Sequence, residues 1–336
     1  MPRRSFAKAG LDATNTNMFT PLNRQESFSS LELSSLSKSR TAKFLEEVNK
    51  KVDWDRLERL LARIYCKDNG RPGFSPIILF RGLLLEQWYQ LSDLALEEEL
   101  KDRLSFRNFV GLDSAEDSPD ETTFVRFRQK LQEHNLEETA FNLIRDDLRK
   151  DNLEIKQGKC LITDASIIEA PYGTEPNGRD GNGDFIQRDG EVKKGYKVHL
   201  ISNQKDNLIE TAKLTYASCH ESRFLENTLD KVEGNVLSVL GDKGYSSDQR
   251  KRDYKAKGIY YGILERARIN QSLTTKQKKK NGRIIKIRSR IERIFAVIKK
   301  HYGFSKVRYF GLRNNTSHLW YVLTAYNIQH AVLNGP

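Results

Sequence analysis

Val236-Leu237-Ser238-Val239-Leu240, followed by Gly241-Asp242-Lys243-Gly244-Tyr245, is the stretch that decides the fold of this 336-residue chain. The apolar run predicts a short buried strand, and the two glycines predict a tight turn directly after it. Asp242 then stands at the carboxyl end of a strand. A second apolar run, Cys160–Thr163, ends in the same way at Asp164. The sequence therefore predicts two strands that each deliver a carboxylate.

A helix after residue 286 would supply a third carboxylate, because apolar side chains recur there at helical spacing. They are Ile287, Ile291, Ile294, Phe295, Ile298 and Tyr302. At about 100° per residue, Arg288, Glu292 and Lys299 gather along one edge of that stripe. Each carboxylate alone has an ordinary explanation, as a turn former or as a member of a surface ion pair. Together, in this order and on these elements, they predict a metal site.

The second half of the chain alternates strand and helix patterns, which predicts an α/β domain with a mixed five-stranded sheet. The predicted strands are Lys159–Asp164, Gly195–Asn203, Leu208–Thr215, Val236–Leu240 and Ile259–Leu264. Further helices are predicted over Ser222–Val232, Ser247–Ala256 and Thr316–Val332. Residues 169–194 are rich in Gly, Asn and Asp and predict a long surface loop. Lys276–Arg290 holds eight Lys or Arg and no acid, and predicts a basic loop.

Residues 41–150 predict an all-helical domain, and residues 1–40 a flexible Ser-rich arm. Apolar residues recur at helical spacing over 41–61, which predicts a first helix. Ser75 followed by Pro76 is a typical start of a second helix. Arg126, Arg128 and Lys130 could follow a DNA backbone, or this domain could be a structural or dimerisation bundle with a solvated basic face. The arm could track phosphates or have no role. Residues 151–336 form the predicted α/β domain.

Two aspartates at strand ends and a glutamate on a late helix resemble the Asp-Asp-Glu catalytic set of DDE transposases. The spacing of Arg288, Glu292 and Lys299, together with Gly241–Tyr245, is similar to the bacterial insertion-sequence transposases of the IS4/IS5 superfamily, and the N-terminal half resembles the IS5 family. The family often has Tyr three residues before the Arg, whereas this chain has Ile285. The resemblance implies a ribonuclease-H-like catalytic domain, and the interval between Asp242 and Glu292 leaves no room for the β-rich insertion of some relatives.

The resemblance also implies an activity: binding of terminal inverted repeats, cleavage of DNA, and transfer of its 3′ ends to target DNA. Two Mg²⁺ ions, or Mn²⁺ in their place, would be held by Asp164, Asp242 and Glu292, with Asp164 bridging both ions. Contacts to nucleic acid are expected from Tyr245, Arg288 and Lys299, and from the basic run Lys278, Lys279 and Lys280. A homodimer in a synaptic complex is expected. Two alternatives stay open: a catalytically inactive DNA-binding relative, and a nuclease of the same fold that does not join strands.

Composition agrees with a DNA partner, since the formal net charge is +12 and the pI is near 9.4. A basic balance that serves only solubility is the plain alternative. The three cysteines, Cys66, Cys160 and Cys219, lack the spacing of a metal site and are expected to be reduced. No apolar stretch reaches the length of a membrane span. The expected location is the bacterial cytoplasm, in association with the nucleoid.

Overall fold

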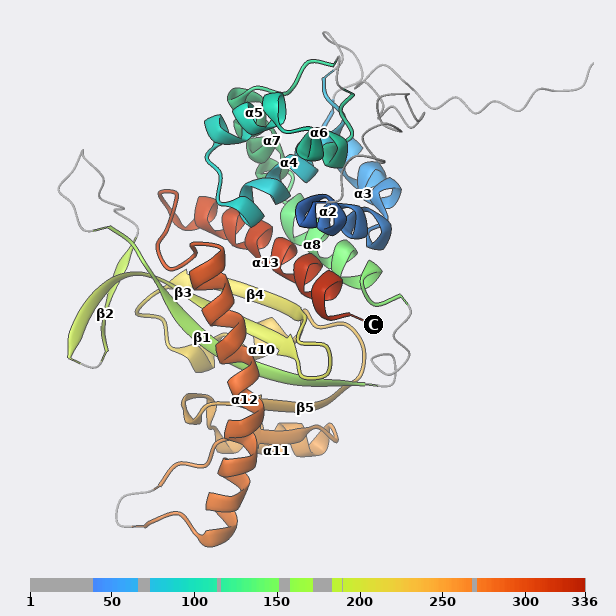
Figure 1. The fold of residues 1–336 in the computed structure, drawn as a ribbon. Helices are drawn as coiled ribbons and strands as arrows, with labels where there is room; N and C mark the ends of the chain where they lie inside the picture. Colours follow the sequence, from blue (N-terminus) through green and yellow to red (C-terminus); the bar gives the residue numbers. More distant parts are fainter. Residues whose placement is uncertain are drawn as a thin grey trace, which may run out of the picture.

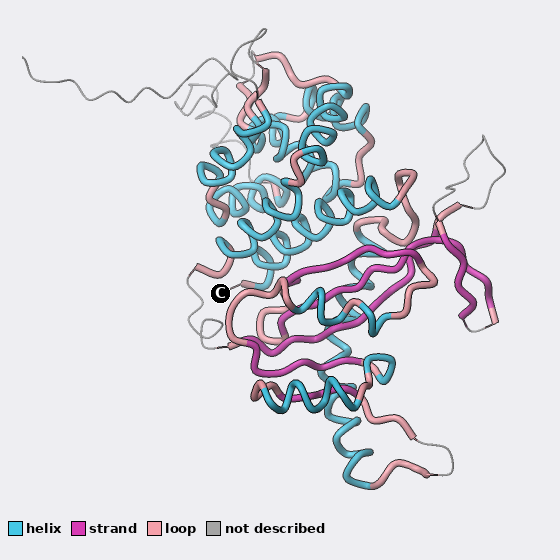
Figure 2. Tube along the Cα trace, turned by 180° about the vertical axis from the view of Figure 1, so that it is seen from behind, coloured by secondary structure: helices cyan, strands magenta, loops and turns pink. Residues whose placement is uncertain are grey.

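The computed structural model describes residues 39–65, 73–113, 116–150, 158–171, 183–188, 190–267 and 271–335. A helical half and a sheet half lie next to each other, as Figures 1 and 2 show. The predicted arm over 1–40 lies outside the described residues except for its last two. Of these, Ser39 caps the first helix by accepting a hydrogen bond from the Ala42 amide at 3.1 Å.

The helical half consists of short helices around a buried central one, α4, whose sequence is apolar on nearly all sides. The helices are α2 (Arg40–Lys51), α3 (Trp54–Leu61), α4 (Pro76–Tyr89), α5 (Asp93–Asp102), α6 (Leu104–Val110), α7 (Glu121–Glu133) and α8 (Leu136–Asp147). The prediction of one helix over 41–61 is wrong. Val52 leaves the helical conformation, and the Asp53 side chain then caps α3 through the Arg56 amide at 3.1 Å.

A six-stranded sheet forms the other half, one strand more than predicted. The strands are β1 (Lys159–Glu169), β2 (Asp184–Arg188), β3 (Glu191–Asn203), β4 (Ile209–Tyr216), β5 (Val236–Gly241) and β6 (Tyr260–Ile263). β1 is antiparallel to β3 and parallel to β5, and β5 is parallel to β6. The extra strand, β2, lies within the stretch predicted to be a loop. It pairs with the start of β3 as a hairpin, which the Gly-rich composition concealed.

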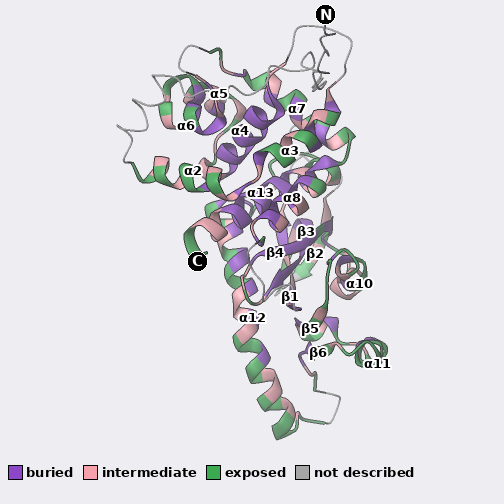
Figure 3. Ribbon diagram, turned by 90° about the vertical axis from the view of Figure 1, so that its right-hand side faces the viewer, coloured by how far each residue is buried: buried purple, intermediate pink, exposed green. Residues whose placement is uncertain are grey.

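Helices cover both faces of the sheet, as the edge-on view in Figure 3 shows. One face carries α12 (Thr275–His301), and the other carries α10 (Leu225–Leu229) and α11 (Asp248–Ala256). The prediction of a basic loop over 276–290 is wrong, because those residues are helical within α12. Thr274 and Gln277 form a capping box at its start, and Lys and Arg are good helix formers, so charge density did not indicate a loop.

The last helix, α13 (Leu312–Asn334), packs between the two halves (Figure 1). Its Asn327 side chain accepts from the Ile209 amide at 2.8 Å and donates to the Ile209 carbonyl at 3.0 Å, so it satisfies the free edge of β4. On the helical side, Trp88 Nε1 donates to the Ala325 carbonyl at 3.0 Å. By these contacts α13 is shared between the halves. None of the described helices is both long and apolar enough to span a bilayer.

Candidate active site

The register of two parallel strands brings Asp164 and Asp242 together. Ile162 on β1 pairs with Leu240 on β5, and each aspartate follows two residues later, Asp164 within β1 and Asp242 directly after the end of β5. Equal offsets from a paired position put the two side chains on the same face of the sheet, next to each other. Asp164 was predicted to end its strand. The structure instead continues β1 to Glu169, because β3 pairs with it along this length after β5 has ended.

The turn after β5 frees the Asp242 carboxylate for the site. The Asp242 carbonyl accepts from the Tyr245 amide at 3.0 Å, but its side chain makes no capping bond. Gly241 is required by crowding, since a Cβ there would lie 2.8 Å from an Ile263 methyl and 2.9 Å from Thr163 Cγ2. The glycine lets β5 close against β1, and the carboxylate emerges at the face covered by α12.

Arg288 on α12 binds both aspartates. Its Nη2 donates to Asp164 Oδ2 at 3.0 Å, and its Nη1 lies 3.5 Å from Asp242 Oδ1. The Asp164 side chain is 17% exposed and that of Asp242 34%, so the pair opens to solvent on the Asp242 side. Burial raises the pKa of the Asp164 carboxyl, although the Arg288 guanidinium and the Ala165 amide oppose the shift. The site therefore combines a largely buried carboxylate, Asp164, and a more open one, Asp242, which share the guanidinium of Arg288.

Glu292 and Lys299 continue the same flank of α12. Lys299 Nζ donates to the carbonyl of Ile167, three residues beyond Asp164 on β1. Glu292 lies one helical turn after Arg288, between these two anchors along β1, and is exposed. The structure thus brings Asp164, Asp242 and Arg288 into contact, and places Glu292 one turn after Arg288 on the same flank of α12.

Comparison with known families agrees with this geometry. Residues 33–130 match the Transposase domain (DUF772), and residues 155–328, more than half of the chain, match the Transposase DDE domain. The chain belongs to the DDE transposase family. The predicted ribonuclease-H-like fold class, behind a helical N-terminal region, is thereby confirmed, as is the enzyme class of phosphoryl transfer.

Two solved structures resemble the transposase at 10% sequence identity each. One is a cryo-EM structure of the piggyBac transposase synaptic complex with hairpin DNA, with a TM-score of 0.41 over 87% of this chain and 73% of that one. The other is a crystal structure of the Mos1 strand transfer complex, with a TM-score of 0.21 over 73% of this chain and 82% of that one.

The family generally uses divalent metal ions, and the donor set of this transposase fits them. Asp164 and Asp242 present hard carboxylate oxygens, which Mg²⁺ and Mn²⁺ prefer, and the burial of Asp164, which Arg288 offsets only in part, favours an added cation. Among the described residues, no three His, Cys, Asp or Glu side chains are already grouped to hold a metal. Glu292 is exposed on the same flank of α12 as Arg288.

Glu221 is a fourth carboxylate at the site of this transposase, and it was not predicted from the sequence. It lies in η2 (Glu221–Arg223), where its Oε2 comes within 3.3 Å of the position that a Cβ on Gly244 would take. It also raises the pKa of the Asp164 carboxyl, after the larger effect of burial. No residue pattern pointed to it, because η2 reaches the turn after β5 only through the fold of the sheet.

The other residues predicted to contact nucleic acid lie in varied surroundings. Tyr245 is buried in the core under α10 and α11, which raises its pKa through desolvation. In the first two turns of α12, Lys278 and Lys279 are exposed, whereas Lys280 Nζ is paired with Glu265 Oε1 at 2.9 Å. Tyr245 thus supports the turn from inside, and the lysines stand on a helix.

Arg126 and Arg128, both on α7 of the transposase, differ in their surroundings. Arg126 is exposed. Arg128 is paired with Glu86 at 2.9 Å and with Asp93 at 2.5 Å inside the helical half. Glu86 is itself buried and also paired with Arg308 at 2.7 Å. The guanidinium of Arg128 therefore already serves a buried ion network in this structure.

Proposed function

We propose that this transposase belongs to the IS5 family, binds the terminal inverted repeats of its insertion sequence, cleaves the DNA and transfers the freed 3′ ends to target DNA. The observation that carries the proposal is the pairing of Asp164 and Asp242 by strand register, with Glu292 on the helix flank that covers them. Asp164, Asp242 and Glu292 are the proposed catalytic and metal-binding residues.

Two divalent ions, Mg²⁺ or Mn²⁺, would activate the attacking oxygen and stabilise charge on the leaving oxygen. Asp164, Asp242 and Glu292 would hold these ions, and Asp164 is the most buried of the three carboxylates. Hydrolysis joins a water oxygen to phosphorus and releases a 3′-hydroxyl. That hydroxyl then attacks a phosphodiester of the target, whose own 3′-oxygen leaves with a proton. The same carboxylates can serve both steps.

Arg288 has to change partners for this chemistry. In the structure its guanidinium neutralises Asp164 and Asp242, the role that metal ions would take. Once released, a guanidinium beside the carboxylates is suited to hold a phosphate oxygen of the substrate near the scissile bond. Lys299, one end of the same flank, is proposed to contact the DNA backbone further along. Arg288 thus acts first as a placeholder and then as a substrate-positioning residue.

DNA is the proposed partner, consistent with the net charge of +12. Lys278, Lys279 and Arg126 are exposed and are proposed contacts. Contact through Lys280, Arg128 or Tyr245, also predicted, would first require the side chain to leave its ion pair or the core. Pairing two ends of one element requires at least two copies of the chain, so we propose a homodimer in the synaptic complex. The proposed location is the bacterial cytoplasm, at the nucleoid.

The test is cleavage and joining of DNA that carries the element's own ends, with and without Mg²⁺. Wild type is expected to cut and to join its 3′ ends to a target plasmid only with the metal, and Asp242→Ala is expected to do neither. Binding of the ends without cutting by either protein would contradict the proposal and indicate an inactive relative. Cutting without joining would indicate a nuclease.

A further inference from the structure

Six cations form a stripe along the flank of α12 that faces away from the carboxylates. They are Lys276, Lys279, Arg283, Lys286, Arg290 and Arg293. They follow one another at intervals of three or four residues, which keeps all six on one face of the helix. At about 100° per residue, that face is turned by about 170° from the flank of Arg288 and Glu292. We refer to these six residues as the basic stripe.

The basic stripe has no acidic partner within the described part of the chain. Arg290 is half-buried and the other five side chains are exposed. On another face of the same helix, by contrast, Lys280 is paired with Glu265. Like charges three or four residues apart on a helix repel each other, so an unpaired stripe lowers the stability of α12 until a polyanion binds. Figures 1 and 3 show that the N-terminal half of α12 projects beyond the sheet, which leaves the stripe open to a large partner.

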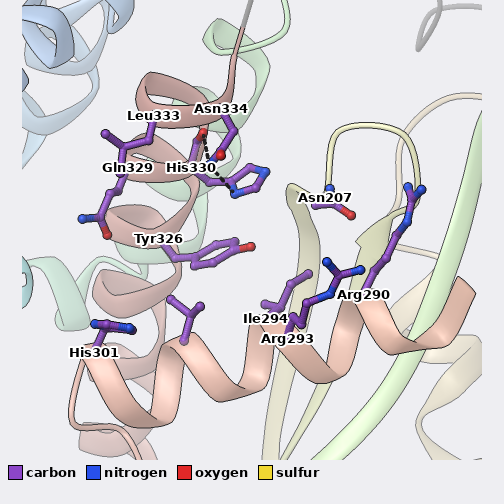
Figure 4. Close-up of a pocket in the computed structure, with 11 residues that line it drawn as sticks. Asn207, Arg290, Arg293, Ile294, His301, Tyr326, Gln329, His330, Leu333 and Asn334 are labelled. Carbon is purple, nitrogen blue, oxygen red and sulfur yellow. Dashed lines mark hydrogen bonds between the residues drawn. The ribbon is translucent and has the colours of Figure 1, made fainter. Parts of the chain in front are cut away.

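The stripe leads into a cavity of about 360 Å³ between α12 and α13. Figure 4 shows Arg290 and Arg293 on its α12 wall and Tyr326 and His330 on its α13 wall. Arg290 donates to the Gln204 carbonyl, and Arg293 Nε donates to the carbonyl of Ser289, one turn earlier, at 3.4 Å. None of the described residues that line the cavity is acidic. Its walls therefore suit an anionic ligand.

The positive charge of the cavity comes from its arginines. Burial lowers the pKa of His330, and Asp206, which is itself paired with Arg149, opposes this shift only in part. His330 is then neutral at pH 7, and its ring stacks on that of Tyr326 at 5.6 Å. Guanidinium groups keep their charge at all physiological pH values, and they bind phosphate in a planar, bidentate geometry.

We propose that the basic stripe and this cavity bind the phosphate backbone of a second DNA segment, distinct from the segment that lies at the catalytic carboxylates. Lys276 to Arg293 spans about 25 Å along the helix, which matches the rise of about seven base pairs. The helix α12 then lies between two DNA segments, the one being cut and one that is only held. This inference rests on the proposed function, since it assumes DNA on the opposite flank.

The test removes two exposed cations of the stripe in the variant Lys286→Gln/Arg293→Gln. The matched control, Lys255→Gln/Lys257→Gln, removes two exposed cations from the last turn and the C-cap of α11. Binding of a fluorescein-labelled duplex is measured by anisotropy over a series of salt concentrations. Each lost phosphate contact reduces the slope of log K against log [salt] by about 0.9, so the stripe variant should lose about 1.8 and the control nothing. Equal slopes and affinities for the two variants would overturn the inference. Thermal unfolding of both proteins establishes that they are folded.

Cleavage at saturating DNA separates this inference from the proposed function. The stripe variant is expected to need more DNA for half-maximal cutting but to reach the wild-type rate. A lower rate at saturation with unchanged affinity would overturn the inference, because the stripe would then serve the catalytic step. If wild type binds DNA but never cuts, the proposed function fails, whereas the salt slopes still decide whether the stripe holds DNA.

Discussion

Two clusters of carboxylates and cations contact the sheet of this transposase, and they differ in charge balance and in access to solvent. On β4, Glu210 is fully buried and surrounded by Arg149 at 2.8 Å, Lys159 at 2.9 Å and Arg145 at 4.0 Å. At the candidate active site, by contrast, two aspartates share Arg288, and Asp242 is partly open to solvent.

The difference indicates which cluster can do chemistry. The Glu210 cluster is balanced in charge, because Arg149 also pairs with Asp206 and Arg145 with Asp146. Glu210 itself has no access to solvent, and the cluster joins the end of α8 to β1 and β4. It holds the helical half on the sheet. The Arg288 cluster has one carboxylate too many and an open side, so it can accept a further cation and a substrate. A buried ion network is a structural device in the first case and an incomplete site in the second.

The largest expected effect is a loss of activity when an aspartate of the Arg288 cluster is replaced. We call this cluster the open cluster and the Glu210 cluster the closed cluster. Asp164→Asn or Asp242→Asn keeps the shape of the side chain but removes a metal-binding charge, and should lower the cleavage rate on the order of a thousandfold. Single-turnover cleavage of end DNA measures this. Glu210→Gln serves as the control in the closed cluster and should cut at the wild-type rate per folded molecule. A comparable loss in that control would remove the distinction between the clusters.

The next effect is on the free energy of unfolding, which should fall more when the closed cluster is changed than when the open cluster is changed. Glu210→Gln leaves Lys159 buried without a carboxylate and Arg149 with Asp206 as its remaining partner, which should lower the free energy of unfolding by about 3–5 kcal/mol. Urea unfolding followed by circular dichroism measures the change, with Asp242→Asn as the matched variant. An unchanged urea midpoint for Glu210→Gln would show that this cluster does not hold the two halves together.

Asp164→Asn should raise stability at neutral pH. Because burial raises the pKa of Asp164 in the folded protein, its ionised form is less stable there than in the unfolded chain. Asparagine removes this penalty, so the gain is complete above the folded pKa and disappears as the pH falls through it towards the ordinary value of 3.8. Thermal midpoints from pH 7 down to pH 4 test the sign, and a variant less stable than wild type at pH 7 would contradict it.

The smallest expected effect sharpens the role of Glu221. Its charge raises the pKa of Asp164, so Glu221→Gln should lower that pKa and extend Mn²⁺ binding to more acidic solution. Calorimetric titration with Mn²⁺ at several pH values measures the shift. Glu233→Gln, at an exposed position shortly before β5, is the control. Identical pH profiles for the two variants would place Glu221 outside the electrostatic field of the site.

The elements of the open cluster were readable from the sequence because strand ends, glycine turns and helical periodicity are local signals. Asp164, Asp242 and the flank of Arg288 and Glu292 follow from such signals. What could not be read depends on pairing between distant segments. Glu221 reaches the site through the fold of the sheet, and β2 exists because β3 offers it an edge. Arg128 looked like a surface cation until the packing of α7 placed it against Glu86. Lys276–Arg290 was predicted to be a loop because of its high charge, although the capping box before it indicates the start of a helix.

We propose that Asp164, Asp242 and Glu292 together hold the divalent metal of this transposase. Iron-directed backbone cleavage tests it most directly: Fe²⁺ is added in place of Mg²⁺ with ascorbate and peroxide, and the protein fragments are mapped by mass spectrometry. If these three residues bind the metal, we expect cuts close to residues 164, 242 and 292. Excess Mg²⁺ should suppress these cuts, and the variant Asp164→Asn should not show them. Cuts elsewhere in the chain, or the same cuts in the variant, would contradict it.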